Sequence, residues 1–265
     1  MTIAHPSPAI AALLAEHPDV RFGFVAAALD GSLAFGVRAG EVFTQASVIK
    51  VPVLWELHRA AGAGELSLDE TLPVDPAAGA GGCGVLQSFA SGVSSIGLGD
   101  LGVLMIVLSD NTATNLLIDR VGIDAVNALL QSKGVAQTRL RRRMMDAQAR
   151  AAGRENTATP AEAVAVMRRL HEEADSGDRA ASATLGVLRL KKESPVTAAL
   201  GDLDPPVRPA TKPGMLEGLR TEWALVRDAR RPYSMALMAD GANDKTLEPL
   251  FRRLAAAIHA EFSAA

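Results

Sequence analysis

The sequence reads QASVIKVP over residues 45–52 and continues in a helix-forming pattern to about Ala61, where Gly62 and Gly64 end it. Ser47 and Lys50 are three residues apart, so on a helix they share one face. A serine hydroxyl is a weak nucleophile that needs a neighbouring base, and a lysine with a lowered pKa can be that base. The helix N-terminus also offers N–H groups to a developing oxyanion. By itself this pattern is common, and an ordinary surface pair is its usual explanation.

Strand patterns lie on both sides of this helix, towards the two ends of the chain. Five strand-like segments lie at residues 21–29, 32–37, 207–211, 222–226 and 233–238. Asp30-Gly31 predicts a hairpin turn between the first two, and an amphipathic helix follows the last at about 245–262. The middle of the chain indicates helices and loops. We therefore expect an α/β (α+β) fold, with an antiparallel five-stranded sheet flanked by helices and an inserted all-helical lobe.

Composition sets the broad class of the protein. The 265 residues allow a sizeable core, and we expect one domain over 1–265, with a sheet lobe at about 1–62 and 203–265 and a helical lobe at about 63–202. Hydrophobic residues make up 48% of the chain and aromatic residues only 4%, which favours a helix-rich globular protein over an aromatic binding platform. A net charge of −3 lacks the basic footprint of a nucleic-acid partner.

The sequence carries no sign of a membrane span, a metal site or a disulfide. Its longest apolar stretch, Leu101 to Leu108, is far short of the roughly 20 residues that cross a bilayer. The N-terminus has no basic region, so we expect no signal peptide and a cytoplasmic protein unless a leader was removed. Cys83 is the only cysteine and the five histidines are scattered, so we expect no cofactor and no metal. Nothing demands a protein partner, and we expect a monomer.

Two further motifs contain residues suited to catalysis. Ser109-Asp110-Asn111 follows an apolar helical pattern at 98–108 and reads either as a simple helix cap or as a loop that presents a hydroxyl and an amide to a cleft. Thr211-Lys212-Pro213-Gly214 opens the second group of strands and reads either as an ordinary turn or as a cleft edge. Gly214 would let a substrate backbone approach such an edge closely.

The three motifs together, in the order Ser-x-x-Lys, Ser-Asp-Asn, Lys-x-Gly, resemble the penicillin-recognising serine hydrolases, meaning class A β-lactamases and penicillin-binding proteins. The similarity extends over roughly residues 20 to 260. It includes LSLDE at 66–70, GVL at 84–86, LSDNTATN at 108–115, RRMMD at 142–146 and TATP at 157–160. A protein of this family takes a small-molecule or peptide substrate.

The resemblance implies a catalytic role for each matching position. Ser47 would attack a carbonyl and become acylated, and Lys50 would take its proton directly or through water. Ser109, helped by Lys212, would relay a proton to the leaving nitrogen. The backbone N–H groups of Ser47 and Met215 would form the oxyanion hole.

It implies substrate-binding roles as well. Asn111 would hold the substrate's side-chain amide, Gly214 would line the strand edge beside it, and Arg220 would pair with a substrate carboxylate.

The sequence departs from the family pattern in two places. The third motif is Lys-Pro-Gly instead of Lys-Thr-Gly, so Pro213 offers neither an N–H nor a hydroxyl. Class A β-lactamases also use a loop glutamate to activate the deacylating water, and an ungapped count from Thr159-Pro160 places Arg143 there. Asp146 and Glu155 are the only acids at 137–156. Asp146 is a possible deacylation base, and a structural role in an ion pair is its alternative.

Three hypotheses follow. The first is an active-site serine hydrolase that forms an acyl-enzyme on β-lactam, D-alanyl peptide or related amide and ester substrates, and deacylates slowly because the glutamate is missing. The second is a true β-lactamase that uses an unconventional base such as Asp146. The third is a catalytically silent binding module that keeps the fold.

Overall fold

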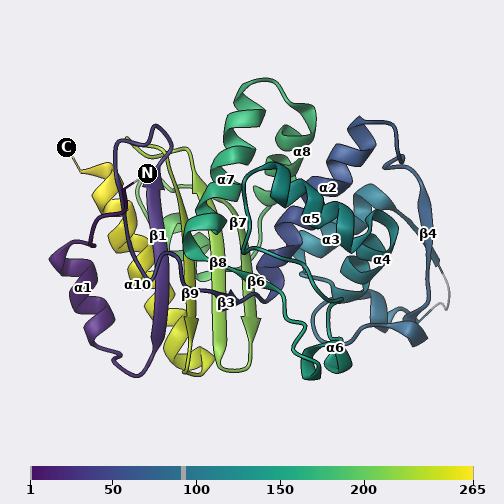
Figure 1. Cartoon of the computed structure of the whole chain (residues 1–265), viewed down its shortest axis with the longest axis horizontal. Coiled ribbons are helices and arrows are strands. Elements are labelled where there is room, and N and C mark those ends of the chain that lie inside the picture. The colour runs from purple at the N-terminus through teal and green to yellow at the C-terminus, as the bar shows by residue number, and fades with distance from the viewer. Residues whose placement is uncertain (1, 91–93, 265) are drawn as a thin grey trace. The chain divides into compact units, whose positions relative to one another are not determined.

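The computed structural model describes residues 2–90 and 94–264, and Figure 1 shows their helices and strands. The chain divides into two compact units. The first comprises Met1–Val48, Thr157–Arg169 and Glu193–Ala265, and the second comprises Ile49–Asn156 and Leu170–Lys192. Helix α7 (Pro160–Asp175) contributes residues to both.

The first unit is built on a five-stranded sheet. Its strands are β1 (Arg21–Ala28), β2 (Ala34–Val37), β7 (Ala210–Leu216), β8 (Leu219–Val226) and β9 (Tyr233–Asp240). They lie in the order β2-β1-β9-β8-β7, and every neighbouring pair is antiparallel. The predicted sheet is therefore confirmed. Strands from the two ends of the chain meet at its centre, where Arg21 faces Asp240 and forms an ion pair at 2.6 Å.

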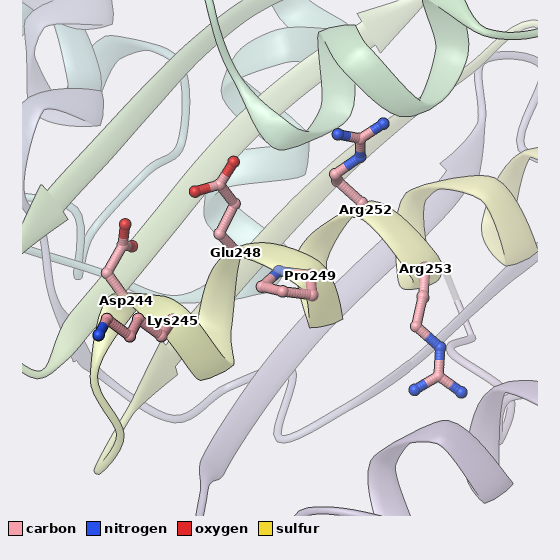
Figure 2. A pocket seen from close by; sticks show the side chains of 6 residues that line it. All are labelled: Asp244, Lys245, Glu248, Pro249, Arg252 and Arg253. Atoms are coloured by element: carbon pink, nitrogen blue, oxygen red, sulfur yellow. The ribbon is translucent and has the colours of Figure 1, made fainter.

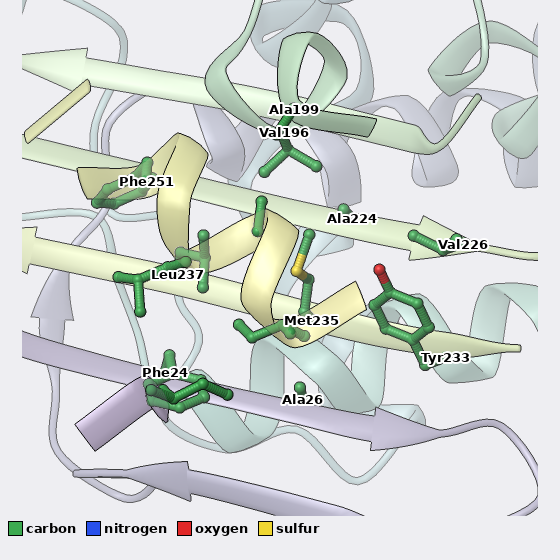
Figure 3. Close-up of a cluster of buried hydrophobic side chains, with 14 of the residues drawn as sticks. Phe24, Ala26, Val196, Ala199, Ala224, Val226, Tyr233, Met235, Leu237 and Phe251 are labelled. Atoms are coloured by element: carbon green, nitrogen blue, oxygen red, sulfur yellow. The ribbon is translucent and has the colours of Figure 1, made fainter. Parts of the chain in front are cut away.

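Helices α1 (Pro8–Ala15), α9 (Pro195–Gly201) and α10 (Asp244–Ser263) pack with this sheet around an apolar core. Figure 3 shows α10 beside β9, with Phe251, Met235 and Leu237 among the buried side chains. Tyr233 stacks on Phe262 with ring centroids 4.3 Å apart. Burial of an aromatic side chain of this kind stabilises the fold by about 2 kcal/mol, and it keeps α10 packed against the sheet.

Strand β7 differs from its predicted extent in a way that matters for the site. It begins at Ala210, three residues later than expected, and continues to Leu216, so the Lys-Pro-Gly motif lies within a strand. Because β7 is an edge strand, it tolerates Pro213, which has no N–H to donate. A second, two-stranded sheet that the sequence did not indicate joins β3 (Phe43–Thr44) to β6 (Thr157–Ala158).

The second unit is mainly helical. It contains α2 (Lys50–Gly62), α3 (Leu98–Val107), α4 (Asn111–Val121), α5 (Ile123–Ser132), α6 (Ala147–Ala151) and α8 (Arg179–Leu188), together with a two-stranded sheet of β4 (Thr71–Val74) and β5 (Ser94–Gly97). Helix α2 packs against α3, α4, α5 and α8. Ten of its thirteen residues are buried. Gly102 allows α3 to approach closely, since a Cβ there would lie 3.1 Å from Leu54 Cδ1.

Among the residues that the structure describes, no helix is both long and apolar enough to cross a bilayer.

Candidate active site

The Lys50 side chain lies at the start of α2 and is completely buried in the second unit. Its Nζ donates to the Ser109 carbonyl at 2.7 Å, to Ser109 Oγ at 3.1 Å and to Asn111 Oδ1 at 2.9 Å. Burial lowers the pKa of the Lys50 amine to about 7, and electrostatic interactions with Cys83 and Asp110 oppose that shift. The amine is therefore poised to exchange a proton near neutral pH.

The contacts of Lys50 suit both of its protonation states. As an ammonium it has three hydrogens for three acceptors. As a neutral amine it has two hydrogens and one lone pair, and Ser109 Oγ is the contact that can reverse and donate. Ser109 presents both its carbonyl and its hydroxyl to Lys50 from a left-handed backbone conformation, with φ of +53°. Such a conformation is uncommon for serine and indicates that the surrounding structure holds it there.

Asp110 and Asn111 fasten the loop at 80–86 to the start of α4. Asp110 caps α4 by accepting from the Ala113 N–H, and its other oxygen accepts from the N–H groups of Val85 and Leu86 at 2.7 and 3.0 Å. Gly84 makes this approach possible, since its φ is +119° and a Cβ would lie 2.3 Å from the Asp110 carboxyl. Asp110 is thus a structural residue of the motif.

The Asn111 side chain is bound on both of its polar atoms. Its Oδ1 accepts from Lys50, and its Nδ2 donates to the Gly81 carbonyl at 3.0 Å. Its backbone N–H donates to the Cys83 carbonyl at 2.9 Å. The second unit therefore brings Lys50 into one cluster with Ser109 and Asn111, which follow it in sequence by 59 and 61 residues.

The segment at 137–156 is held by side chains from within and from α4. Asn115 accepts from the Met144 N–H at 2.7 Å and donates to the Met144 carbonyl at 3.1 Å. Asn156 accepts from two successive N–H groups of the segment, those of Arg141 and Arg142. Arg142 also pairs with Glu155 at 2.6 Å. Side-chain hydrogen bonds therefore fix the backbone of this segment at Met144 and on its N-terminal side.

The residue that this segment places near Asn111 is Met145. A Cβ on Gly82 would lie 2.8 Å from Asn111 Nδ2 and 3.3 Å from Met145 Sδ, so both side chains flank the same glycine. Met145 has φ of +60° and is 53% exposed. Arg143, which the sequence count placed at the glutamate position, instead pairs with Asp119 at 3.0 Å.

Asp146 caps the short helix α6 by accepting from the Ala149 N–H at 2.8 Å. It also lines a hollow of about 400 Å³ in the second unit, together with Thr112, Asn115, Met144 and Met145. Its carboxylate thus has a structural task. The structural role that the sequence suggested for Asp146 as an alternative is seen here as a helix cap.

The first unit brings Ser47 and strand β7 together. Ser47 is partly exposed and opens a 3₁₀ turn, Ser47–Ile49, which runs directly into α2. A Cβ on Gly214 would lie 2.8 Å from the Ser47 backbone nitrogen and 3.0 Å from Ala46 Cβ. The absence of a side chain at Gly214 therefore lets β7 approach the Ser47 N–H, and Met215 follows on the same strand.

Lys212 and Arg220 are both buried on neighbouring strands. Lys212 lies opposite Trp223, and its Nζ donates to the Pro213 carbonyl at 2.8 Å. Arg220 lies opposite Met215 and donates through Nε and Nη2 to Asp244 Oδ1, at 2.8 and 2.5 Å. Glu248 lies 3.8 Å from Arg220 Nη2, and Figure 2 shows Asp244 and Glu248 on the same side of α10. One edge of the guanidinium is therefore already occupied.

No three His, Cys, Asp or Glu side chains gather to hold a metal ion anywhere in residues 2–90 or 94–264. The chemistry on offer comes from a serine hydroxyl, a buried amine near neutral pKa, and N–H donors close to the serine.

The family model of the beta-lactamase enzyme family matches residues 5–262. The chain belongs to this family. It is a serine hydrolase of the β-lactamase and penicillin-binding type, as its solved structural relatives also indicate. No protein among the curated sequences matches the chain at a significant level.

Similar solved structures cover almost the whole of this beta-lactamase family chain. A beta-lactamase from Sphaerobacter thermophilus is 28% identical, with 97% of each chain covered and a TM-score of 0.86. A mutant of PBP-A, in an acyl-enzyme complex with penicillin G, is 25% identical, with 97% of this chain and 95% of that chain covered and a TM-score of 0.85. A class A beta-lactamase from Mycobacterium abscessus is 22% identical, covers 97% and 100%, and has a TM-score of 0.83; it shows the fold alone.

Sequence reasoning did not single out Asn115 or Met145. Asn115 is four residues after Asn111, so on α4 the two share a face, and that spacing was a signal that could have identified it. Met145 had no such signal, because its place beside Gly82 depends on contacts between distant segments.

Proposed function

We propose that Ser47 is acylated by a strained or activated carbonyl compound, such as a β-lactam, a D-alanyl peptide or a related amide or ester, and that the acyl group leaves slowly. The observation that carries this proposal is Lys50, a buried amine with a pKa lowered to about 7, one helical turn after Ser47. A silent binding module would have no use for such an amine, because burying it costs stability.

In the acylation step, Ser47 Oγ forms a bond to the carbonyl carbon and its proton passes to neutral Lys50, directly or through water. The carbonyl π electrons move onto oxygen, where the N–H groups of Ser47 and Met215 stabilise the charge. When the intermediate collapses, the C–N bond breaks and the leaving nitrogen takes a proton from Lys50 through Ser109. Lys212 supports this transfer with its positive charge.

Substrate recognition uses three further groups. Asn111 holds the amide on the acyl side, and Gly214 lets that part of the substrate lie against β7. Arg220 binds a carboxylate through the guanidinium edge that Asp244 leaves open, which gives a contact weaker than a full bidentate pair.

Slow deacylation follows from the residue beside Asn111. Hydrolysis of the acyl-serine needs a base that takes a proton from water. Met145 offers a thioether, which cannot take it, and the nearby carboxylate of Asp146 caps α6. A relative, the PBP-A mutant, has been seen as an acyl-enzyme with penicillin G, which supports penicillins as probes.

The deciding experiment follows intact mass over time after mixing the protein with penicillin G. We expect a single adduct that maps to a Ser47 peptide and persists for many times the acylation half-time. Ser47→Ala is the matched control and must show none. Absence of an adduct on the wild-type protein, with no labelling of Ser47 by activated esters or fluorophosphonates, contradicts the proposal and favours the silent module.

The same time course separates the two enzyme hypotheses. Rapid turnover of a chromogenic cephalosporin, with no accumulating adduct, would favour a true β-lactamase. Asp146→Asn then tests its base. This change leaves an amide oxygen to cap α6, so a loss of turnover would point to proton transfer rather than to loss of the cap.

A further inference from the structure

A buried glutamate lies beneath the strand that carries Lys212. Glu222 on β8 is opposite Pro213 on β7 and is only 1% exposed. Adjacent residues on a strand point to opposite faces of the sheet. Lys212 faces the same side as Trp223, its partner in the register, so Glu222 lies on the other face. It does not touch substrate.

The contacts of Glu222 join three elements. Its Oε1 lies 2.9 Å from Thr211 Oγ1, the diagonal neighbour on β7 and the residue directly before Lys212. Its Oε2 accepts from the Val196 N–H at the start of α9 at 3.4 Å, and Ser194, which caps α9, also bonds to it. The carboxyl therefore links β8 to β7 and α9.

Hydrogen counting at Thr211 indicates how this carboxyl is protonated. Thr211 Oγ1 lies 2.9 Å from Glu222 Oε1 and 2.9 Å from the Trp223 carbonyl. A hydroxyl has one hydrogen, so it can give a full hydrogen bond to only one of these acceptors, and sharing the hydrogen between them weakens both bonds. If Glu222 carries a proton, it donates to Thr211, and Thr211 donates to Trp223. Both contacts are then satisfied.

We infer that Glu222 is a positioning residue, a neutral carboxylic acid whose proton ties Thr211, and through it Lys212, to the sheet. Burial supports this by raising the pKa of the Glu222 carboxyl. The charged group that acts on it is Arg220, two residues earlier on β8, whose opposing effect is smaller than that of burial. Pro213 has no N–H for a neighbouring strand, so the Thr211 contact matters more for this edge.

The role of Glu222 rests on the proposed function, but its protonation can be tested without it. Glu222→Gln is a neutral match for the protonated acid, because its NH₂ donates to Thr211 and its oxygen accepts from Val196. The unfolded acid titrates near its ordinary value of 4.5 and the folded one above it. Wild-type stability from this group is therefore complete below 4.5 and is lost as pH rises towards the folded pKa.

We expect Glu222→Gln to remove that loss, so that its stability relative to wild type increases from pH 5 to pH 8 in denaturant titrations. A parallel pH dependence of the two proteins, or a Gln variant that is less stable across this range, overturns the protonation. This arm needs no substrate, so it stands even if Ser47 proves unreactive.

The positioning role is tested by the Ser47 acylation rate constant. Glu222→Leu removes the link, and Thr211→Val is a milder version in case the Leu variant does not fold. We expect a roughly tenfold to hundredfold slower acylation with little change in substrate affinity, since a small displacement of a catalytic group costs about that much. The Gln variant should retain the wild-type rate. Wild-type rates in a folded Leu or Val variant overturn the positioning role.

Discussion

Asn115 holds Met144 by both backbone groups, accepting from its N–H at 2.7 Å and donating to its carbonyl at 3.1 Å. Because Met145 comes next in the chain, this pair helps to place the Met145 side chain, which flanks Gly82 together with Asn111 in the second unit.

Replacing Asn115 by Ala should destabilise the protein, because the Met144 backbone groups lose their partners. We expect a loss of roughly 2 kcal/mol, since an unpaired buried polar group costs about 1–3 kcal/mol. The measurement is urea unfolding. Asn115→Asp can still accept from the N–H but cannot donate to the carbonyl, so its stability should lie between those of the wild-type protein and the Ala variant. Equal stability of all three would show that the clamp has no energetic role.

Converting Met145 to Glu should speed deacylation. The substitution places a carboxylate beside Asn111, where a base could activate water for attack on the acyl-serine. We expect the lifetime of the penicillin G adduct to fall by roughly a hundredfold, as general-base catalysis contributes about 10²–10⁴. Met145→Gln, of matching shape and no charge, should keep the long lifetime. If both substitutions shorten it equally, loosening of the segment is the cause.

The acylation rate should rise with pH around neutrality. Lys50 acts as a base only when neutral, and burial lowers the pKa of its amine to about 7, so the rate should reach half its plateau near that pH. Stopped-flow measurement with a chromogenic substrate gives the profile. Lys50→Arg should abolish acylation at every pH, because a guanidinium remains protonated. A flat profile from pH 5 to pH 9 would exclude Lys50 as the base.

His58 should make the protein sensitive to acid. Its ring lies in α2 with Nδ1 2.8 Å from Thr184 Oγ1, and burial lowers its pKa from 6.5 to about 4. A group whose folded pKa is lowered binds its proton more tightly when unfolded, so stability falls as pH drops from 6.5 to about 4. The loss is on the order of 3 kcal/mol. Thermal unfolding from pH 7 to pH 4 measures it, and His58→Gln should lack this component.

Much of the fold was predictable because its signals are local. The hairpin at Asp30-Gly31 and the helix after Ser47 follow from turn residues and apolar periodicity. The extent of β7 was not predictable, since proline and glycine usually end a strand. Pro213 and Gly214 are tolerated here because β7 is an edge strand and Gly214 packs closely against Ser47.

The candidate site likewise has features that the sequence predicts and features that depend on tertiary packing. The spacing of Ser47 and Lys50 is visible in sequence, as is the pairing of a hydroxyl with an amide at Ser109 and Asn111. That Lys50 is buried and bonded to both of them depends on the packing of α2 against α4, which no local pattern encodes. The protonation of Glu222 likewise depends on a contact with Thr211 across the sheet.

The central pairing of β1 with β9 has a consequence for biosynthesis. Arg21 and Asp240 are 219 residues apart, so β1 acquires that neighbour only after the long intervening stretch of chain has been synthesised. Such non-local pairing slows folding, because the chain loses entropy on closing the long loop before the strand contacts form and stabilise it. The contiguous stretch 49–156 has no such delay. The helices of this stretch can therefore pack before β9 has been synthesised, while β1 still lacks its neighbour in the sheet.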